Sequence, residues 1–201
     1  MRKLVLLISA CMVVAQADLA RAQEVDVALG GSTLFSSKPT SASLAYPPPA
    51  EKGGTYPGVS VDYILKNRYG FNGEFAYRYK DQLYNGYQRL RPVLYDVNGV
   101  FAPQISKKMT AEFMAGFGGQ SLIFYNKFAS CNPVYAGNCP ISISSNHFLL
   151  HLEGGVRYYF WRHFFARPEA HYYYIVGNTD QFHSANVLRL GASIGYTFSA
   201  K

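Results

Sequence analysis

Residues 71–80 read Phe-Asn-Gly-Glu-Phe-Ala-Tyr-Arg-Tyr-Lys, and this stretch decides the fold of the chain. Every second residue is aromatic or glycine, and most of the residues between them are polar or charged. A period of two is the pattern of a β-strand whose faces meet different surroundings, whereas an amphipathic helix needs a period of 3.6 residues. The stretch therefore predicts a strand with Phe71 and Phe75 on one face and Glu74 and Arg78 on the other.

Seven further segments show the same alternation. They lie at 25–35, 59–66, 93–101, 109–118, 148–160, 164–174 and 188–198. None of them sustains a helical period, so a helical interpretation fails throughout. The connections alternate in length, with longer ones at 36–56, 81–88, 126–145 and 175–185 and shorter ones at 67–69, 102–108 and 161–163. The sequence therefore predicts an all-β fold, an eight-stranded antiparallel up-and-down barrel with one long-loop end and one short-turn end.

The composition agrees with this prediction. The chain has 201 residues, a length that suits one domain, and it contains 17 Tyr, 14 Phe and 18 Gly. Only 15% of its residues are charged and 16% are aromatic, which excludes a disordered chain. The mean hydropathy is −0.06, and only the first residues approach the length of a membrane-spanning helix.

Alternation alone does not show which face points inward. A soluble lipocalin-like barrel with a ligand in its interior would have the apolar face inside, whereas a membrane barrel turns that face toward lipid. The polar face mixes glycine and serine with charges of both signs, unlike a lysine-rich soluble surface. The apolar face gains tyrosine and phenylalanine near strand ends, and such rings suit a membrane interface. These observations favour a transmembrane barrel in contact with lipid.

The last strand carries a further pattern, Arg189-Leu190-Gly191-Ala192-Ser193-Ile194-Gly195-Tyr196-Thr197-Phe198. It resembles the terminal assembly signal of bacterial outer-membrane barrels, with Gly191, Ile194, Tyr196 and Phe198 at the characteristic positions. With the preceding strands, the chain resembles the OmpA/OmpX-type small outer-membrane β-barrel family along nearly its whole length after the first 22 residues. This resemblance implies an outer-membrane location, with membrane lipids and the barrel assembly machinery as partners.

The interior of an eight-stranded barrel is just wide enough for side chains to fill. Charges buried there must be paired, because a lone buried charge costs several kcal/mol. We expect a plug of ion pairs across the lumen; a narrow charge-lined pore is the alternative. The expected network consists of Glu74, Arg78, Asp96, Glu112, Glu153, Arg157, Arg167, Glu169 and Arg189.

The amino terminus has the pattern of an export signal. Arg2 and Lys3 precede an apolar run at 4–15, and Ala20 and Ala22 are the small residues of a cleavage site. We expect a secretory signal peptide at 1–22 and the barrel domain at 23–201. A lipoprotein with lipidated Cys11 is the alternative, since residues 8–11 resemble a lipobox.

Cys131 and Cys139 remain after the signal peptide and would enter an oxidising compartment. An even pair of cysteines there predicts a disulfide that closes a small loop. A metal site is less favoured, because the segment 130–140 holds no histidine and no further cysteine. The basic residues are dispersed, so the sequence gives no sign of nucleic-acid binding.

An enzymatic function is not expected. Some small outer-membrane barrels are lipid A deacylases or acyltransferases, and the deacylases carry a histidine and a serine two positions apart on a late strand, followed by an asparagine. Here His183 and Ser184 are adjacent, so in a strand they would face opposite sides. His151, Glu153 and His171 form a second candidate cluster, which we interpret as interior polar groups with satisfied hydrogen bonds. We predict no catalytic residue, no metal and no cofactor.

The loops remain as the candidate sites of function, because loops on a rigid scaffold commonly carry recognition. The first loop contains a proline-rich stretch at 46–49 and then Gly53 and Gly54, and the loop with the two cysteines carries Tyr135. We therefore expect a structural or surface-interaction role with an extracellular ligand. A lipid-modifying enzyme is the alternative.

Overall fold

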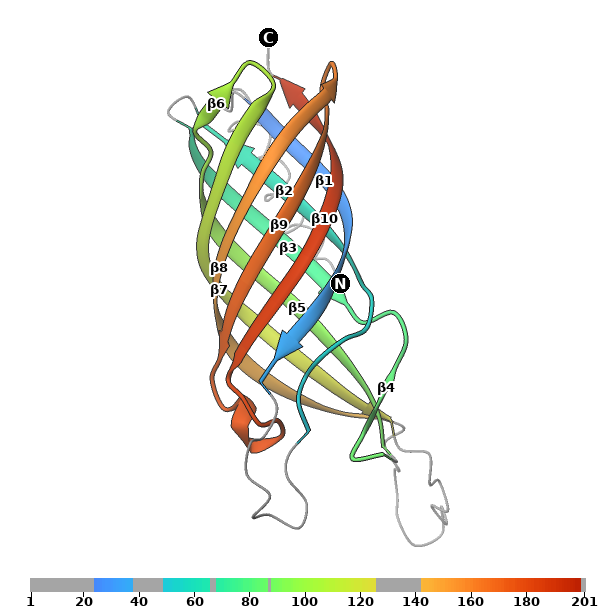
Figure 1. The fold of residues 1–201 in the computed structure, drawn as a ribbon. Coiled ribbons are helices and arrows are strands. Elements are labelled where there is room, and N and C mark those ends of the chain that lie inside the picture. Colours follow the sequence, from blue (N-terminus) through green and yellow to red (C-terminus); the bar gives the residue numbers. More distant parts are fainter. Residues whose placement is uncertain (1–23, 38–48, 66–67, 87, 126–141, 200–201) are drawn as a thin grey trace, which may run out of the picture.

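The computed structural model describes residues 24–37, 49–65, 68–86, 88–125 and 142–199, and they form a single closed sheet (Figure 1). The elements are β1 (Glu24–Ser36), β2 (Tyr56–Ile64), β3 (Tyr69–Tyr77), β4 (Gln82–Tyr84), β5 (Gln88–Phe101), β6 (Gln104–Ser106), β7 (Met109–Tyr125), β8 (Ser142–Trp161), β9 (Phe164–Ile175), a 3₁₀ turn η1 (Asn178–Asp180) and β10 (Asn186–Ser199).

Eight of these strands form the barrel, each antiparallel to its neighbours. The order β5-β3-β2-β1-β10-β9-β8-β7 closes because β5 also pairs with β7. The first and last strands pair along their full length, from Glu24 opposite Ser199 to Ser36 opposite Val187. The predicted eight-stranded antiparallel barrel is confirmed. No helix in the described ranges has the length and apolar character needed to span a membrane.

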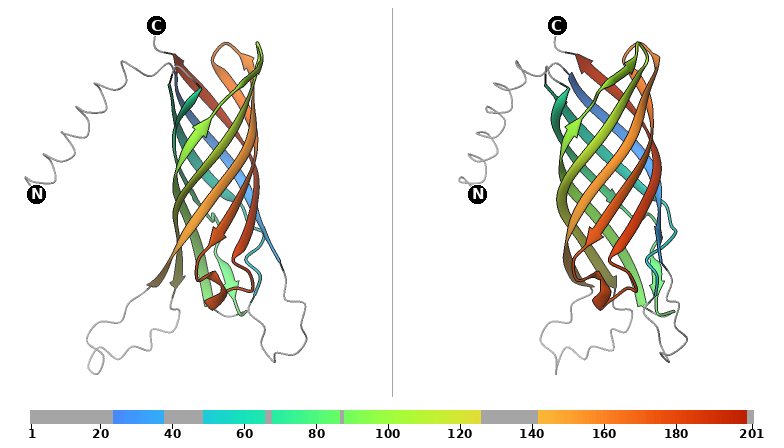
Figure 2. Two further views of the ribbon diagram at one scale, coloured as in Figure 1. Left: turned by 90° about the vertical axis from the view of Figure 1, so that its left-hand side faces the viewer. Right: turned by 60° about the vertical axis from the view of Figure 1, so that its left-hand side comes forward.

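The barrel has two unlike ends, as the views in Figures 1 and 2 show. We call the end with β4 and η1 the loop end, and the end with β6 the turn end. At the turn end, β8 and β9 are separated by two residues, and β2 and β3 by a short link. The amino-terminal end of β1 and the carboxyl-terminal end of β10 also lie there.

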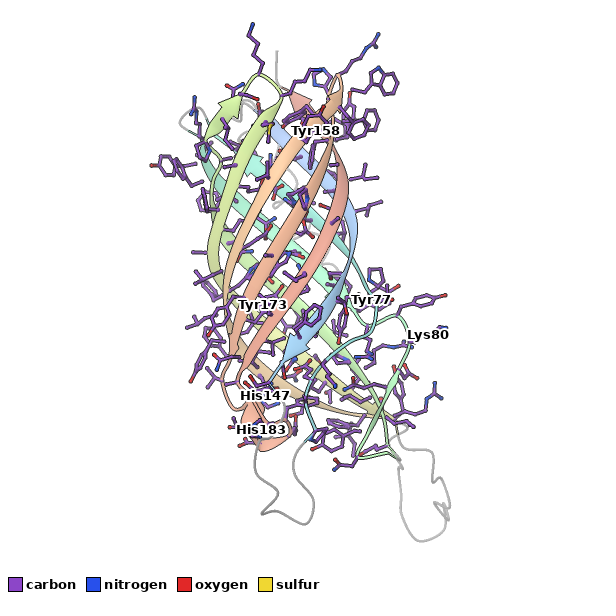
Figure 3. All side chains as sticks on the ribbon, in the orientation of Figure 1. Tyr77, Lys80, His147, Tyr158, Tyr173 and His183 are labelled. Atoms are coloured by element: carbon purple, nitrogen blue, oxygen red, sulfur yellow. The ribbon has the colours of Figure 1, made fainter. Side chains whose placement is uncertain are left out.

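The two faces of the strands are sharply different. In β3, Phe71 and Phe75 are exposed whereas Asn72, Glu74 and Ala76 are buried. Large apolar side chains therefore cover the outside of the barrel, where many sticks project in Figure 3, and the charged residues face inward. The predicted orientation is confirmed, and the lipocalin-like alternative is wrong because it requires an apolar interior.

The interior is layered along the barrel axis. Toward the loop end lies an apolar cluster of Leu34, Tyr56, Leu94, Leu149, Tyr173, Ile175 and Val187. Toward the turn end lies a smaller cluster of Ile64, Val100, Ala102 and Met114. The buried charges lie mainly between these clusters, although Glu112 and Arg157 occupy strand positions nearer the turn end than Met114 does.

Some details differ from the sequence prediction, since the short strands β4 and β6 lie in the predicted connections 81–88 and 102–108. The strand at 71–80 ends at Tyr77. The Arg78 amide still donates to the Pro92 carbonyl in register, but Pro92 has no amide hydrogen to donate in return, and the Tyr79 amide donates to the Thr55 carbonyl. Pro168 lies inside β9. The β8–β9 register is the same on both sides of it, and the irregularity of this pair lies between Tyr159 and Trp161.

Candidate functional site in the barrel lumen

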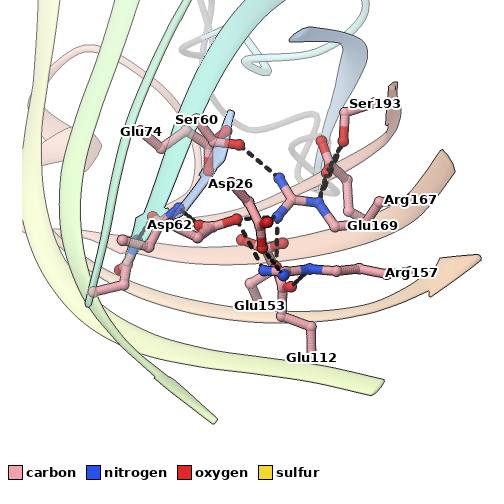
Figure 4. A network of polar contacts seen from close by, with 12 residues as sticks. Asp26, Ser60, Asp62, Glu74, Glu112, Glu153, Arg157, Arg167, Glu169 and Ser193 are labelled. Atoms are coloured by element: carbon pink, nitrogen blue, oxygen red, sulfur yellow. Dashed lines mark hydrogen bonds and ion pairs between the residues drawn. The ribbon is translucent and has the colours of Figure 1, made fainter. Parts of the chain in front are cut away.

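Polar side chains from all eight barrel strands meet in the middle of the lumen. Successive residues of a strand alternate between its faces, so charges at every second position converge on the axis. We call one group the arginine network: Asp26, Ser60, Asp62, Glu112, Arg157, Arg167, Glu169 and Ser193 (Figure 4). We call a second group the histidine cluster: Glu74, His151, Glu153 and His171.

Arg157 on β8 is the first centre of the arginine network. Its guanidinium pairs with Asp26 on β1 and Glu112 on β7, and its Nη2 lies 2.9 Å from Oδ2 of Asp62 on β2. The guanidinium also lies over the Phe165 ring, 5.3 Å from its centroid. The side chain is fully buried, so this one cation connects strands on opposite walls of the barrel.

Arg167 on β9 is the second centre. Its Nη1 lies 2.5 Å from Oε1 of Glu112 and 3.2 Å from Oδ2 of Asp62, and its Nε lies 2.8 Å from Oε2 of Glu169. Nη2 donates to the Ser60 hydroxyl at 2.8 Å. The two arginines thus share Asp62 and Glu112. Charge-assisted hydrogen bonds of this kind are the strong ones in a dry interior.

A chain of amides connects the two groups. Asn72 Nδ2 donates to Oδ1 of Asp62 at 2.5 Å, and Asn98 Nδ2 donates to Oδ1 of Asn72 at 2.8 Å and to Oδ1 of Asp96 at 2.6 Å. The Asn98 amide oxygen is thereby turned toward His151, whose Nδ1 lies 2.9 Å away. The amide orientations are therefore determined by their neighbours.

The histidine cluster has two nearly parallel imidazoles at its centre. His151 Nε2 lies 3.1 Å from His171 Nδ1, and that same Nδ1 lies 3.3 Å from Oε2 of Glu153 and 3.6 Å from Oε2 of Glu74. The ring planes differ by 11°. Arg189 approaches from β10, with Nη2 pairing with Glu74 and lying 2.9 Å from His171 Nδ1.

The structure places eight of the nine predicted network residues in this lumen. Arg78 is the exception, and its assignment to the lumen is corrected. It follows the end of β3 at the loop end, where Nη1 donates to the Gly53 carbonyl at 2.9 Å and the guanidinium lies over the Tyr56 ring. Gly53 and Gly54 have positive φ angles of 68° and 87°, which let the chain turn beneath Arg78.

Sequence reasoning missed two acids, Asp26 and Asp62. Both are fully buried and both pair with Arg157. The signal was present, because each lies on the polar face of its alternating segment. Their convergence depends on the register of β1, β2 and β8 around the barrel, which alternation within one strand does not reveal.

The residues of the proposed assembly signal lie on β10. Ile194 and Phe198 are exposed on the outer face, and Tyr196 packs edge-on against Phe164 with ring centroids 4.9 Å apart. Gly191 permits a close approach to β1, because a Cβ there would lie 2.7 Å from Cβ of Ser32 and 2.9 Å from the Gly31 carbonyl oxygen. The motif thus fits the strand that closes the barrel.

The loop end is covered by folded segments. Glu51 is fully buried there, with Gln120 Nε2 donating to its Oε1 at 2.6 Å and Asn178 Nδ2 lying 3.4 Å from its Oε2. Burial raises the pKa of the Glu51 carboxyl, and these hydrogen bonds oppose the rise. The His183 amide donates to the Pro49 carbonyl at 3.1 Å, which ties the β9–β10 connection to the same segment.

Of the remaining sequence predictions, the one about Ser184 concerns a described residue and the others do not. The Ser184 hydroxyl contacts Asn186, donating to its carbonyl at 3.2 Å and accepting from its amide at 3.0 Å, so its described partners are backbone groups. The predicted disulfide Cys131–Cys139, the predicted signal peptide at 1–22 and Tyr135 lie outside the described residues.

The free space in the lumen is small. A cavity of about 10 Å³ lies among Ser60, Glu74, Arg167, Arg189 and neighbouring residues, which is space for about one water molecule. A wider hollow of about 490 Å³ lies at the turn end, lined by Glu24, Arg68, Lys107, Arg162, His163 and others. The barrel thus narrows from an open mouth at the turn end to a packed middle.

Comparison with solved structures agrees with this geometry. The amino-terminal barrel of Pseudomonas aeruginosa OprF superimposes with a TM-score of 0.59 at 13% identity, over 88% of this chain and 98% of that one. The chain has the fold of small outer-membrane β-barrels. No protein-family model matches the sequence, and no curated protein matches it either.

Two further small barrels share this fold. Neisserial surface protein A matches with a TM-score of 0.57 at 11% identity, over 87% of this chain and 96% of that one. Ail of Yersinia pestis, solved in complex with the heparin analogue sucrose octasulfate, matches with a TM-score of 0.55 at 14% identity, over 87% and 97%. The shared feature is the barrel, since identities this low leave little of the sequence in common.

Proposed function

We propose that the protein is an integral outer-membrane barrel with a closed lumen, which acts through its loop end. The observation that carries this proposal is the buried arginine network, which crosses the lumen on the turn-end side of the larger apolar cluster, inside a wall of exposed apolar side chains. Charges arranged in this way suit a packed structural core. They leave the loops as the surface that is free to vary and to bind.

The outer surface supports the membrane location. Leu29, near the middle of β1, is 66% exposed, and Phe113 and Phe117 on β7 are 56% and 60% exposed. So many exposed large apolar side chains, spread over every strand, would drive aggregation in water, whereas a lipid bilayer covers them. Aromatic residues also gather at the turn end, where Trp161 and Phe164 stack with ring centroids 5.5 Å apart.

The packing of the lumen supports its closure. A hydrated ion needs a continuous water-filled path, but Arg157 and Arg167 cross the lumen and the cavity beside them is about 10 Å³. The apolar cluster toward the loop end includes Tyr56 and Tyr173, both fully buried. An ion moving along the barrel axis would have to displace both these arginines and this apolar cluster.

Single-channel recording in planar bilayers tests the closed lumen. The protein, produced from the full chain and reconstituted from detergent, is expected to give no steady open events at any moderate voltage. Its insertion is checked on the same sample by protection of the barrel from protease. Steady open events of uniform size from inserted protein would contradict the closed lumen and favour the narrow pore.

A specific observation favours polyanions as the ligand class at the loop end. Lys80 lies at this end (Figure 3), and the Arg78 Nε donates to its carbonyl at 3.1 Å. Beside it, Arg89 pairs with Asp81, and Arg91 Nη2 lies 2.7 Å from Oδ1 of the same acid. Ail, which shares the fold, was solved with a heparin analogue. We propose that anionic saccharides bind this surface, whether sulfated glycans or phosphorylated lipid headgroups.

Retention on immobilised heparin, as a function of salt, tests this ligand class. Lys80→Glu with Arg89→Glu is expected to lower the salt concentration at which the protein elutes, because fewer counterions are exchanged. The matched control makes the same charge change at the turn end, Lys107→Glu with Lys108→Glu. If both variants elute at equally lowered salt, the retention depends only on net charge and the proposed surface is wrong. Repeating the assay with vesicles that contain phosphorylated lipids distinguishes lipid headgroups from sulfated glycans as the ligand.

The proposal assigns no catalytic role to His183 and Ser184. The Ser184 hydroxyl bonds backbone groups of Asn186, and the His183 amide is held by Pro49. His183→Ala and His171→Ala should therefore leave the lipid A of the producing cells unchanged. A changed acylation pattern in mass spectra with either variant would reverse this assignment.

A further inference from the structure

We propose that the histidine cluster binds a divalent first-row transition-metal ion, with Zn²⁺ as the ion whose ligand preference it fits. The four ligand atoms come from three strands: Glu74 on β3, His151 and Glu153 on β8, and His171 on β9. This inference does not depend on the closed lumen or on the loop-end ligand. It differs from the interpretation of His151, Glu153 and His171 as polar groups with satisfied hydrogen bonds: both histidines have such partners, whereas the Glu153 oxygens have none among the described residues.

The fold brings these residues together through its register. His151 and Glu153 are two positions apart on β8 and therefore face the same side. Glu153 lies directly opposite His171 in the β8–β9 pair, and Glu74 reaches the cluster from β3 on another part of the wall. A ligand bound here would connect separate parts of the barrel, as a structural metal does.

The spacing of the ligand atoms fits a tetrahedral ion. Zinc bonds of 2.0–2.2 Å place neighbouring tetrahedral ligands about 3.3–3.6 Å apart. From Nδ1 of His171 the other three atoms lie at 3.1 Å (His151 Nε2), 3.3 Å (Glu153 Oε2) and 3.6 Å (Glu74 Oε2). All four atoms lie within 4.8 Å of one another, so only small side-chain movements are needed.

The outer nitrogens of both imidazoles have acceptors, as in many metal sites. His151 Nδ1 lies 2.9 Å from the Asn98 amide oxygen and 3.2 Å from Oδ1 of Asp96. His171 Nε2 lies 3.4 Å from Oε1 of Glu169, and Arg189 Nη2 lies 2.8 Å from the same nitrogen. When these outer nitrogens carry the hydrogens, the inner nitrogens, His151 Nε2 and His171 Nδ1, carry none. Their lone pairs then face each other across 3.1 Å. A cation beside such a pair stabilises it: Arg189 Nη2 lies 2.9 Å from His171 Nδ1, and a proton or a metal ion between the two rings would act in the same way.

The two glutamates supply unpartnered oxygens. Neither carboxylate oxygen of Glu153 has a hydrogen-bond donor among the described residues, and its side chain is 0% exposed. Glu74 pairs with Arg189 through Oε1, whereas its buried Oε2 accepts no hydrogen bond. A buried carboxylate oxygen without a donor is costly, and coordination to a cation removes that cost.

The charge balance of the lumen also favours a bound cation. In the described part of the chain, three guanidinium groups there (Arg157, Arg167 and Arg189) face seven carboxylates. The carboxylates belong to Asp26, Asp62, Glu74, Asp96, Glu112, Glu153 and Glu169. Asp96 and Glu153 contact imidazoles and no guanidinium. Arg189 Nη2, 2.9 Å from His171 Nδ1, would retreat onto Glu74 when a metal ion binds that nitrogen.

Titration with Co²⁺, followed by displacement with Zn²⁺, tests the site. The protein is produced from the full chain without a histidine tag, extracted in detergent and treated with a chelator. Folding is checked by heat-dependent gel migration. We expect one equivalent of Co²⁺ to produce the ligand-field absorption of a tetrahedral N/O site, and one equivalent of Zn²⁺ to abolish it. Elemental analysis before chelation gives the ion that the protein carries from the cell.

Two variants locate the binding. Glu153→Gln keeps the shape of the side chain and removes one ligand, and it should weaken binding by more than about 100-fold, beyond the effect of losing an outer-shell partner. His163→Ala removes an exposed imidazole at the turn end and should bind as the unaltered protein does. Glu74→Gln serves as the second ligand variant if Glu153→Gln does not fold.

The absence of saturable Co²⁺ or Zn²⁺ binding by the folded, unaltered protein would overturn the proposal. Equal binding in Glu153→Gln and in the unaltered protein would do the same, because the ion would then sit elsewhere. A proton shared by the two imidazoles would be the remaining interpretation of their 3.1 Å contact.

Discussion

The arginine network and the histidine cluster lie side by side in one lumen, yet they treat buried charge differently. In the arginine network Asp26, Asp62, Glu112 and Glu169 each contact at least one guanidinium. In the histidine cluster Glu153 contacts only an imidazole, and neither of its oxygens accepts a hydrogen bond from a described residue. In the first arrangement the chain itself supplies a cation to every carboxylate, whereas in the second we propose that a bound cation does so.

Buried charges in a barrel lumen can therefore have two different roles, structural stabilisation and ligand binding. A guanidinium reaches several carboxylates at once because its donors form a fixed fork, and removal of one partner leaves charges uncompensated. An imidazole is neutral in one state and offers a lone pair, so it suits an exchangeable ion. The first group therefore serves stability, and the second is the better candidate for binding.

The largest effect is expected from Arg157→Met, which breaks the arginine network. Asp26, Asp62 and Glu112 would lose a shared partner, and such a loss costs about 3–5 kcal/mol in a buried site. Reversible urea unfolding in lipid vesicles, followed by tryptophan fluorescence, measures the change. A decrease of less than about 1 kcal/mol in the free energy of unfolding would indicate that water compensates these charges. The arginine network and the histidine cluster would then not differ as described.

The next largest loss of stability is expected from a charge placed on the outer, lipid-facing surface of the barrel. Leu29→Arg places a charge where the outer surface is apolar, and it should cost about 2–4 kcal/mol near the bilayer midplane. Phe35→Arg, close to the loop end of the same strand, is the matched control and should cost about 0–1 kcal/mol. Equal costs at the two positions would contradict the depth dependence that a membrane-spanning wall requires.

A smaller effect of opposite sign is expected from Glu153→Gln in the presence of a chelator. The variant removes a buried negative charge that has no hydrogen-bond donor, so the barrel should gain about 1 kcal/mol in its free energy of unfolding. The same unfolding assay measures it beside Arg157→Met. If Glu153→Gln destabilises the chelated protein as strongly as Arg157→Met does, the two groups are equivalent and the comparison fails.

The smallest expected effect is a pH dependence of local stability at the loop end. Glu51 is buried like Glu153 but receives donors from Gln120 and Asn178, and burial raises its pKa. Because the folded state holds the proton more tightly, its stability falls as the pH rises from about 4.5 through the raised pKa of the folded state.

Hydrogen exchange at the Gly53 amide, which donates to the Leu34 carbonyl, reports this change at the loop end. After correction for intrinsic rates, its protection should decrease with pH in the unaltered protein and stay constant in Glu51→Gln. The same pH dependence in both proteins would assign it to another group.

The fold could be predicted from the sequence because a membrane barrel repeats one simple rule. Each strand, such as the one containing Phe71 and Glu74, has lipid on one side and a packed lumen on the other, so the period of two is clear. Strand ends were less predictable. Arg78 continued the alternation in the sequence, but Pro92 opposite it has no amide hydrogen for the ladder, and the Arg78 side chain donates to the Gly53 carbonyl.

The candidate site could be predicted only in part. Alternation placed His151 and Glu153 on the inner face, and His171 on the neighbouring strand, but it gave no reason for Glu74 to join them. That contact depends on the stagger of β3 relative to β8 around the closed barrel, which no single segment encodes. The same holds for Asp26 and Asp62, which meet Arg157 across the lumen.

Contact of the apolar face with lipid is the central claim, and a single tryptophan at position 29 tests it most directly. In a Trp161→Phe background, which removes the sole native tryptophan, Leu29→Trp places a fluorophore on the outer face of β1. In vesicles of lipids brominated deep in their acyl chains, this fluorescence should be strongly quenched, and a water-soluble quencher should have little effect. Efficient quenching from water, with none from the brominated chains, would contradict the membrane barrel.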